Sequence, residues 1–260
     1  MLVKDVYECI NKEAPYNLAC NWDNSGFLAG KGDMEVTNVM VALDFTEDVL
    51  SEAIKNSCNL IVTHHPFIFK GLTSITDQSY EGRLLIKLIE NKMSIICAHT
   101  NLDMAIGGIN DVLCEKIGLS DVSHLGFAGE DSEGNTIGEL RMGNVETSLG
   151  VFIDNVKNAL GCDAVKYCGD VAEKIKTVAV CSGSGSDFME LAYKSGADAF
   201  LTADAKYHDF QKALKLGISL IDAGHFETED IICEKLICLL EKVGLKAVKS
   251  SSHNGFYKFR

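Results

Sequence analysis

The sequence has little of several features that mark particular classes of protein. Of its 260 residues only 2 are proline and 1 is tryptophan. No apolar run reaches the roughly 18 residues that a membrane-spanning helix needs, so no membrane association is expected. Basic residues are also few: 24 lysines and arginines stand against 37 aspartates and glutamates, for a formal net charge of −13. Nucleic acid is therefore not expected as a partner, because phosphate binding requires a basic surface.

Disulfide bonds are not predicted either. The chain has 10 cysteines, but they are scattered and no CxxC pair occurs. Most lie inside apolar runs, which is typical of small buried side chains in a reducing compartment. The first residues lack the apolar core of a signal peptide, so we predict a cytoplasmic protein.

Strand-like and helix-like segments alternate along the chain. Short apolar segments predict strands at 38–43, 60–62 and 93–98, with helices between them at 47–56 and 81–91. Thr46 is expected to cap the helix that follows it. This alternation is typical of an α/β fold with a parallel sheet.

The same alternation recurs later in the chain. At an offset of 139 positions, residues 39–63 register with residues 178–202 without a gap, so that Thr63 falls on Thr202. We predict two related α/β halves, 1–125 and 126–234, with their strand ends facing a shared cleft. Residues 235–260 either complete the first half or stay separate, and the sequence leaves this open.

Residues suited to metal chemistry stand at the ends of the predicted strands, where open parallel sheets bind their ligands. Five of the seven histidines are among them. The set consists of Asp44, His64, His65, His99, Asp103, Asp204, His208, Asp222, His225 and Glu229. Imidazole and carboxylate ligands suit Zn, Mn, Fe or Ni. Their number exceeds what one tetrahedral ion needs and favours two ions.

Two details of this set bear on the metal prediction. His64 and His65 are adjacent, so both rings reach one cavity only if the turn before Pro66 breaks the strand alternation. Otherwise the pair merely caps a strand. His225 and Glu229 are four residues apart and share a face if a helix begins early enough.

Five stretches, taken together, resemble a known family. They are NWDNSGFLAG (21–30), VTHHPFIFKGL (62–72), AHTNLDMAIGGIND (98–111), LTADAKYHDFQKA (201–213) and DAGHFETE (222–229). They resemble the family often labelled GTP cyclohydrolase 1 type 2 homologue, whose members hold two metal ions and assemble as ring-shaped hexamers. The resemblance implies that His64, His65, Asp103, His225 and Glu229 bind two divalent ions per subunit. It also implies a homohexamer.

The resemblance implies a metal-dependent hydrolase acting on a small, nucleotide-like substrate, in the nominal reaction by opening the imidazole ring of a guanine nucleotide. A non-enzymatic metal carrier, regulator or assembly module is the alternative. One departure concerns the middle loop, where a GRxG-type stretch of the family reads Asn135-Thr136-Ile137-Gly138. A substrate contact by arginine there is not expected.

Other residues have weaker signals. His99 and His208 are candidate catalytic residues, His99 by orienting a ligating carboxylate and His208 by moving a proton. Each could equally be a structural histidine. The glycine- and serine-rich loop at 181–186 is either a tight turn or a phosphate cradle. Trp22 either packs or stacks on a base.

Overall fold

The computed structural model of the chain describes residues 1–126, 129–130, 136–252, 255–258 and 260. These residues form two compact units. The first contains residues 1–105 and 232–256, and the second contains residues 106–231 and 257–260. None of the described helices is long and apolar enough to cross a membrane.

The first unit is built on a five-stranded sheet of order β1-β4-β3-β2-β13. Its strands are β1 (Gly26–Ala29), β2 (Asn38–Ala42), β3 (Leu60–Thr63), β4 (Ser94–Cys97) and β13 (Lys246–Lys249). All neighbours are parallel except β1, which pairs antiparallel with β4. The sequence predicts three of these strands, β2, β3 and β4. The polar residues that follow each of them lie at one edge of the sheet.

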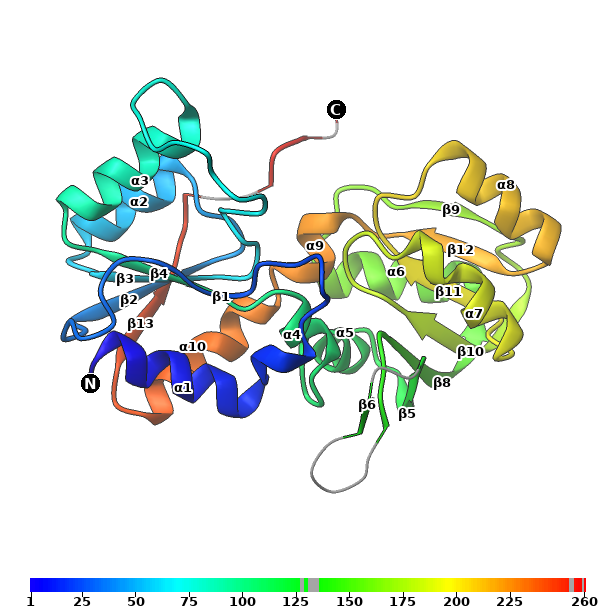
Figure 1. Cartoon of the computed structure of the whole chain (residues 1–260). Coiled ribbons are helices and arrows are strands. Elements are labelled where there is room, and N and C mark those ends of the chain that lie inside the picture. The colour runs from blue at the N-terminus through cyan, green and yellow to red at the C-terminus, as the bar shows by residue number, and fades with distance from the viewer. Residues whose placement is uncertain (127–128, 131–135, 253–254, 259) are drawn as a thin grey trace. The chain divides into compact units, whose positions relative to one another are not determined.

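Helices cover both faces of this sheet (Figure 1). On one face lie α2 (Glu47–Lys55) and α3 (Tyr80–Glu90), and on the other α1 (Val3–Glu13) and α10 (Ile232–Lys242). The hydroxyl of Thr46 accepts a hydrogen bond from the Val49 amide (3.2 Å), which confirms the predicted cap. Leu50 and Leu88 from the first pair of helices are fully buried against the sheet. A short 3-10 turn, Tyr16–Leu18, and the short helix α4 (Thr100–Met104) complete the unit.

The C-terminal strand belongs to this first sheet. β13 pairs parallel with β2, with Ala247 opposite Val39, although the two lie about two hundred positions apart in the sequence. Glu52 of α2 then accepts hydrogen bonds from Ser250, Ser251 and Ser252. Residues 250–252 are thereby fixed to the first unit.

The second unit has a six-stranded sheet of order β5-β8-β10-β11-β12-β9. Its strands are β5 (Ser120–Leu125), β8 (Leu140–Ser148), β9 (Lys166–Cys168), β10 (Lys174–Val180), β11 (Ala199–Thr202) and β12 (Ser219–Asp222). β10, β11 and β12 are parallel, whereas β5, β8 and β9 pair antiparallel. The α/β class is therefore confirmed, with a parallel centre and antiparallel margins. A two-stranded ribbon, β6 (Gly129–Glu130) with β7 (Thr136–Ile137), stands apart.

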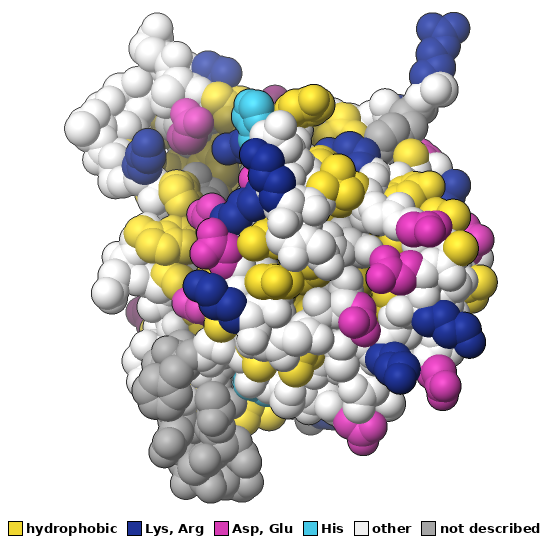
Figure 2. Space-filling model, turned by 90° about the vertical axis from the view of Figure 1, so that its right-hand side faces the viewer, with side chains coloured by type: hydrophobic (Ala, Val, Ile, Leu, Met, Phe, Trp, Pro, Cys, Tyr) yellow, Lys and Arg dark blue, Asp and Glu magenta, His cyan; other side chains and the backbone are white. Residues whose placement is uncertain are grey.

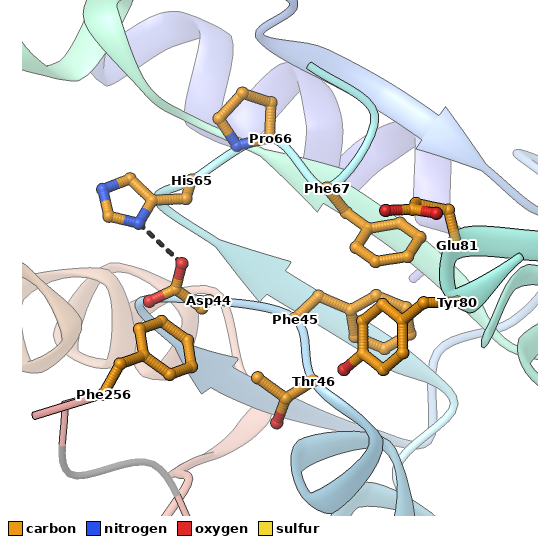
Figure 3. Close-up of a pocket in the computed structure, with 9 residues that line it drawn as sticks. All are labelled: Asp44, Phe45, Thr46, His65, Pro66, Phe67, Tyr80, Glu81 and Phe256. Atoms are coloured by element: carbon orange, nitrogen blue, oxygen red, sulfur yellow. Dashed lines mark hydrogen bonds and ion pairs between the residues drawn. The ribbon is translucent and has the colours of Figure 1, made fainter. Parts of the chain in front are cut away.

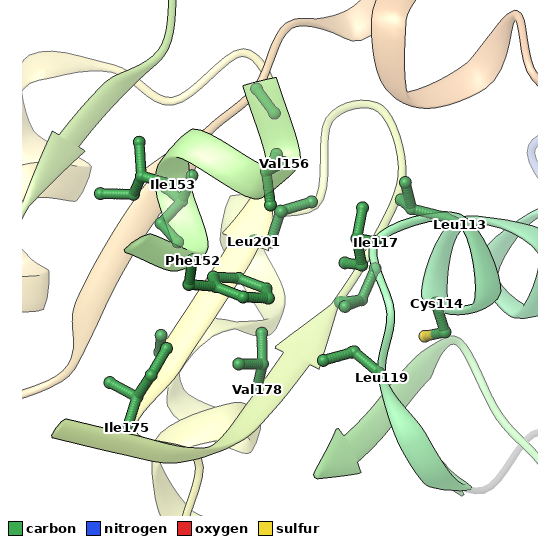
Figure 4. Packing of buried hydrophobic residues seen from close by; sticks show 14 of the residues in the cluster. Leu113, Cys114, Ile117, Leu119, Phe152, Ile153, Val156, Ile175, Val178 and Leu201 are labelled. Carbon is green, nitrogen blue, oxygen red and sulfur yellow. The ribbon is translucent and has the colours of Figure 1, made fainter. Parts of the chain in front are cut away.

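Two apolar clusters sandwich the second sheet. On one face α5 (Ile109–Lys116) and α6 (Leu149–Leu160) bury Leu113 and Phe152 against Val178 and Leu201 (Figure 4). On the other face α7 (Met189–Lys194), preceded by a 3-10 turn, and α8 (Tyr207–Leu216) cover Phe200. Successive residues of β10 and β11 alternate between the clusters, as a pleated strand requires.

An ion pair with a fully buried guanidinium ties α5 to β8 in the second unit. Arg141 is fully buried, and its Nε and Nη2 donate to the two carboxylate oxygens of Asp111 at 2.7 and 3.0 Å. Its Nη1 donates to the carbonyl of Gly138 at 2.7 Å. This bidentate geometry satisfies a guanidinium that would otherwise be costly to bury.

The structure differs from the sequence-based expectations in several places. The apolar spacing of residues 228–243 favours one helix, whereas the structure has two, α9 (His225–Glu229) and α10, which begins at Ile232. The sequence also allows strands at 246–248 and 255–259. The first is part of β13, whereas the described residues 255–258 form no strand and Phe259 lies outside the described residues. The halves 1–125 and 126–234 remain a prediction about duplication. The compact units of the structure have different boundaries from these halves, because β5 pairs with β8 and so belongs to the second unit.

Figure 2 shows acidic and basic side chains interspersed on the face that it draws. On that face the described lysines and arginines do not gather into one stripe.

Candidate metal centre

Three imidazoles gather in the first unit, at the carboxyl ends of β3 and β4. His64 and His65 follow β3, and His99 follows β4. The ring centroids lie 5.2 Å apart for His64 and His65, 5.2 Å for His64 and His99, and 5.6 Å for His65 and His99. A ligand atom of each residue lies within 4.8 Å of the others. The turn before Pro66 thus breaks the strand alternation, and both adjacent rings lie on one side.

The Nδ1 atoms of His64 and His65 each lie against a hydrogen-bond acceptor. Nδ1 of His64 lies 2.8 Å from the carbonyl oxygen of Ala98, and Nδ1 of His65 lies 2.8 Å from Oδ1 of Asp44. Because a carbonyl or carboxylate oxygen accepts, Nδ1 is the donor in both rings. Nε2 is then the nitrogen available as a ligand, which is how metal-binding histidines are usually oriented.

Asp23 holds His99 in the same way. Its Oδ1 accepts from Nδ1 of His99 at 2.8 Å, and its Oδ2 accepts from the hydroxyls of Ser25 and Thr100, both at 2.6 Å. Burial acts to raise the pKa of Asp23, but hydrogen bonds from His99, Ser25 and Thr100 outweigh it and hold the pKa well below its usual range. Asp23 is therefore a fixed negative charge behind His99.

Asp103 reaches the cluster from α4, directly after His99. Its Oδ1 lies 3.5 Å from Nε2 of His64, whose side chain is completely buried. With the His64 proton on Nδ1, a nitrogen lone pair faces a carboxylate oxygen at this distance. A shared cation would stabilise such an arrangement.

The second unit carries the other predicted ligands on one short helix. α9 begins at His225, early enough for His225 and Glu229, four residues apart, to share one face of the helix. Nε2 of His225 lies 2.9 Å from Oε2 of Glu229. Nδ1 of His225 lies 2.8 Å from Oδ2 of Asp204. With Nδ1 donating to Asp204, the contact with Glu229 requires a proton or a metal ion on Nε2. Glu229 is only 4% exposed, so its charge needs a partner.

Asp222 positions the loops that carry these residues. This carboxylate, at the end of β12, accepts hydrogen bonds from the amides of Ala205 (3.0 Å) and Gly224 (3.2 Å). It also pairs with Lys166 at 2.6 Å. These contacts are with the protein's own backbone and with Lys166. Asp222 therefore fixes the backbone beside Asp204 and beside His225.

Gly183 lies against the pair His225–Glu229. Its φ is +57°, and a Cβ added there would overlap the Glu229 carboxylate and stand 3.4 Å from Cε1 of His225. A side chain at this position is thus excluded both by conformation and by space.

The glycine- and serine-rich loop uses its amides internally. The amide of Ser182 donates to Asn110, that of Gly183 to Thr228, and that of Gly185 to Thr202, at 2.7, 3.1 and 2.9 Å. These contacts favour the tight turn over the phosphate cradle, because the same N–H groups are not free to bind an anion.

The other candidates differ in their surroundings. His208 is exposed on α8, with its ring against Tyr207 at a centroid distance of 5.4 Å, and it takes no part in the described contacts of His225. Trp22 is 61% exposed, and its ring lies 5.9 Å from that of Phe69 and 6.2 Å from that of His99. Most of the indole is thus not packed. Of the NTIG stretch, Asn135 lies outside the described residues.

Sequence reasoning overlooked three carboxylates with one common role. Asp44 and Asp204 appeared in the strand-end set without a function, and Asp23 was not included at all. Each accepts from Nδ1 of a histidine that is distant in sequence. The position of Asp44 and Asp204 directly after strands was the available signal, whereas Asp23 offered none.

Comparison with known proteins gives the family. Residues 1–254 match the family model described as Duf34/NIF3 (NGG1p interacting factor 3). The chain belongs to the Duf34/NIF3 family. This confirms the resemblance seen in the five motifs, because relatives of the chain carry the label that those motifs suggest.

Two relatives match the chain over almost their full length. A protein from Clostridium acetobutylicum is 37% identical over 264 residues, covering 99% of this chain and 98% of the relative. One from Campylobacter jejuni is 35% identical over 261 residues, covering 100% of both. Both are named GTP cyclohydrolase 1 type 2 homolog.

Solved structures agree with the fold. A Staphylococcus aureus hypothetical protein superposes with a TM-score of 0.92 at 31% identity, covering 100% of this chain and 99% of that one. A Bacillus cereus protein related to NIF3 also gives 0.92, at 23% identity and with the same coverage, and shows the fold alone.

Proposed function

We propose that this Duf34/NIF3 protein binds two divalent metal ions and uses them as a metal-dependent hydrolase. The proposed ligands are His64, His65 and Asp103 from the first unit and His225 and Glu229 from the second. The observation that carries the proposal is the contact of Nε2 of His225 with Oε2 of Glu229 at 2.9 Å while Nδ1 lies against Asp204. A buried carboxylate facing a ring nitrogen in this way is a donor pair suited to a cation.

The composition of the donor set supports two ions. Three imidazoles and two carboxylates exceed the ligands of one tetrahedral ion, and no cysteine is among them, unlike most closed structural zinc sites. Such donors accept Zn, Mn, Fe or Ni, and the ion bound depends on supply as well as affinity. Bound divalent ions would lower the pKa of a coordinated water and polarise the bond under attack.

The remaining residues have supporting roles in the proposal. Asp44 and Asp204 accept the Nδ1 protons of His65 and His225 and so keep each Nε2 pointed at its ion. Asp23 accepts the Nδ1 proton of His99 in the same way, and we propose that His99 orients a ligating carboxylate. His208, exposed to solvent, is proposed to exchange protons with the substrate.

The proposed substrate is small and nucleotide-like. The support is the name that the relatives carry, GTP cyclohydrolase 1 type 2 homolog. Since the same ligand set would serve the hydrolysis of a phosphoester or an amide, the chemistry of the site alone does not select the substrate.

We also propose a homohexamer in the cytoplasm. All 10 cysteines are free, which suits a reducing compartment. The hexamer follows from the family resemblance. Light scattering should give six times the 28.3 kDa of one chain, and a monomer at micromolar concentration would contradict this part.

Metal analysis followed by a substrate screen tests the central proposal. After reconstitution with Zn, Mn or Fe, we expect two ions per chain. His65→Ala should lower the metal content, whereas His208→Ala should leave it unchanged because His208 is not a proposed ligand. One ion or none in the unaltered protein would overturn the dinuclear site. Two ions without turnover of nucleotides, phosphoesters or amides would favour the carrier or assembly role.

A further inference from the structure

A pocket of about 420 Å³ lies beside His65 in the first unit (Figure 3). Its walls come from the residues that follow β2, from those that follow β3, from the start of α3 and from the C-terminal tail. Asp44 and His65 form one end, so the pocket adjoins a proposed metal ligand. Neither the hydrolase chemistry nor the family name assigns it a ligand.

Aromatic rings form much of the pocket wall. Phe45 and Phe67 pack edge to face, with centroids 4.9 Å apart and an interplanar angle of 87°. Figure 3 shows Tyr80 next to them and Phe256 beside Asp44. Tyr80 and Phe256 are 44% and 75% exposed, so their rings are available to a ligand. Ring faces attract cations as well as apolar groups.

The charge of the lining is negative. It includes the carboxylates of Asp44 and Glu81 and contains no lysine or arginine. Asp44 accepts from His65, whereas Glu81 forms no ion pair with any described residue. Glu81 lies in the first turn of α3, where the helix dipole stabilises an ionised carboxylate. Phosphate and carboxylate groups are therefore disfavoured in this pocket.

We propose that the pocket binds an organic ammonium group carried on an aromatic or apolar body. The rings of Phe67, Tyr80 and Phe256 contact the body, and Glu81 pairs with the ammonium. The inference goes beyond the proposed function: the bound ammonium compound lies beside His65, a proposed metal ligand, but its binding requires no metal ion.

Three probes with one phenyl body separate charge from shape: 2-phenylethylammonium, 2-phenylethanol and phenylacetate. Each is titrated by NMR into the full-length chain, metal-free and metal-loaded. In both forms we expect the ammonium to bind about tenfold more tightly than the alcohol, since a cation on an aromatic face beside a carboxylate gains that order of affinity. Phenylacetate should not bind to the metal-free protein.

Variants assign the binding to this pocket. Glu81→Gln should weaken 2-phenylethylammonium about tenfold and leave 2-phenylethanol unchanged. Glu90→Gln, at the exposed far end of the same helix, should change neither. Phe256→Ala should weaken both probes, because it removes a ring that contacts the shared body.

Equal affinities for the ammonium and the alcohol, or an unchanged ammonium affinity in Glu81→Gln, would overturn the inference. Failure here and failure of the proposed function are distinguishable. A chain that binds two metal ions but does not prefer the ammonium overturns only the pocket. A chain that prefers the ammonium but binds no metal overturns only the metal centre.

Discussion

Asp204 accepts a 2.8 Å hydrogen bond from His225 while its own backbone has a left-handed φ of 54°. A non-glycine residue in this region costs on the order of 1 kcal/mol, although aspartate and asparagine tolerate it better than most. Asp222 holds the following loop through the amide of Ala205. The backbone is thus bent at this point so that a carboxylate reaches Nδ1 of the histidine.

The first prediction concerns this pair. Asp204→Asn keeps the size of the side chain and its tolerance of left-handed backbone but removes the charge that orients His225. We expect metal affinity to fall by about tenfold or more, the usual effect of altering the residue behind a ligating histidine. Competition against a chelating dye measures it. The control Asp187→Asn, an exposed acid, should match the unaltered protein, and equal affinity for both variants would contradict the role given to Asp204.

The second prediction concerns Gly183. Gly183→Ala should displace the Glu229 carboxylate and reduce metal binding, because the added Cβ would overlap it. The matched control is Gly196→Ala, since Gly196 also has a positive φ of +87° but nothing within 4 Å of an added Cβ. Both variants should lose about 1 kcal/mol of stability from backbone strain. Only Gly183→Ala should lose metal by elemental analysis, and equal metal contents would count against the close approach.

The third prediction is a pH dependence of stability at Glu52. Burial acts to raise its pKa, but hydrogen bonds from Ser250, Ser252 and Ser251 prevail and lower it from 4.5 to about 2. Because the folded-state pKa is depressed, the stabilisation is fully present above pH 4.5 and is lost as the pH falls towards 2.

Glu52→Gln should therefore destabilise the metal-free protein at pH 7 and progressively less as the pH falls below 4.5. Urea unfolding at a series of pH values measures the difference between the two proteins. Glu35→Gln serves as an exposed control. A difference that stays constant down to pH 3 would show that the charge of Glu52 does not contribute.

The fourth prediction concerns the ion pair between Arg141 and Asp111. Arg141→Met should cost about 3 kcal/mol, because it leaves Asp111 without its bidentate partner. The double variant Arg141→Met with Asp111→Asn should recover part of this loss, since the uncompensated charge is gone. Arg83→Met, on an exposed arginine of α3, should change stability by less than about 0.5 kcal/mol. Additive effects of the two changes in the double variant would refute the coupling.

The parallel centre of each sheet could be predicted because its strands are short apolar runs with helices between them. β2, β3 and β4 all begin within a residue or two of their expected positions. The antiparallel strands at the edges could not be predicted, because their residues are unevenly buried. β5 (Ser120–Leu125), for example, is mostly exposed. Pro66 and the adjacent histidines left two arrangements open, and in the structure both rings lie on one side.

The histidines and carboxylates of the candidate site could be collected from strand ends, since parallel strands bring these positions to one edge of the sheet. Which acid orients which ring could not be known, because it depends on contacts between distant segments. Asp23 and His99 are separated by 76 positions. The break between α9 and α10 was also hidden, since the apolar spacing continues across it.

Because β13 pairs with β2, the first unit can complete its fold only late in synthesis. Residues 106–231 emerge from the ribosome as an unbroken stretch and contain nearly all of the second unit. The first unit still lacks α10 and β13 at that moment, and the free edge of β2 stays unpaired until residue 249 has been made. The part of the protein that is translated first is thus the part that finishes folding last, and a chain stopped after residue 231 would expose a sheet edge prone to association.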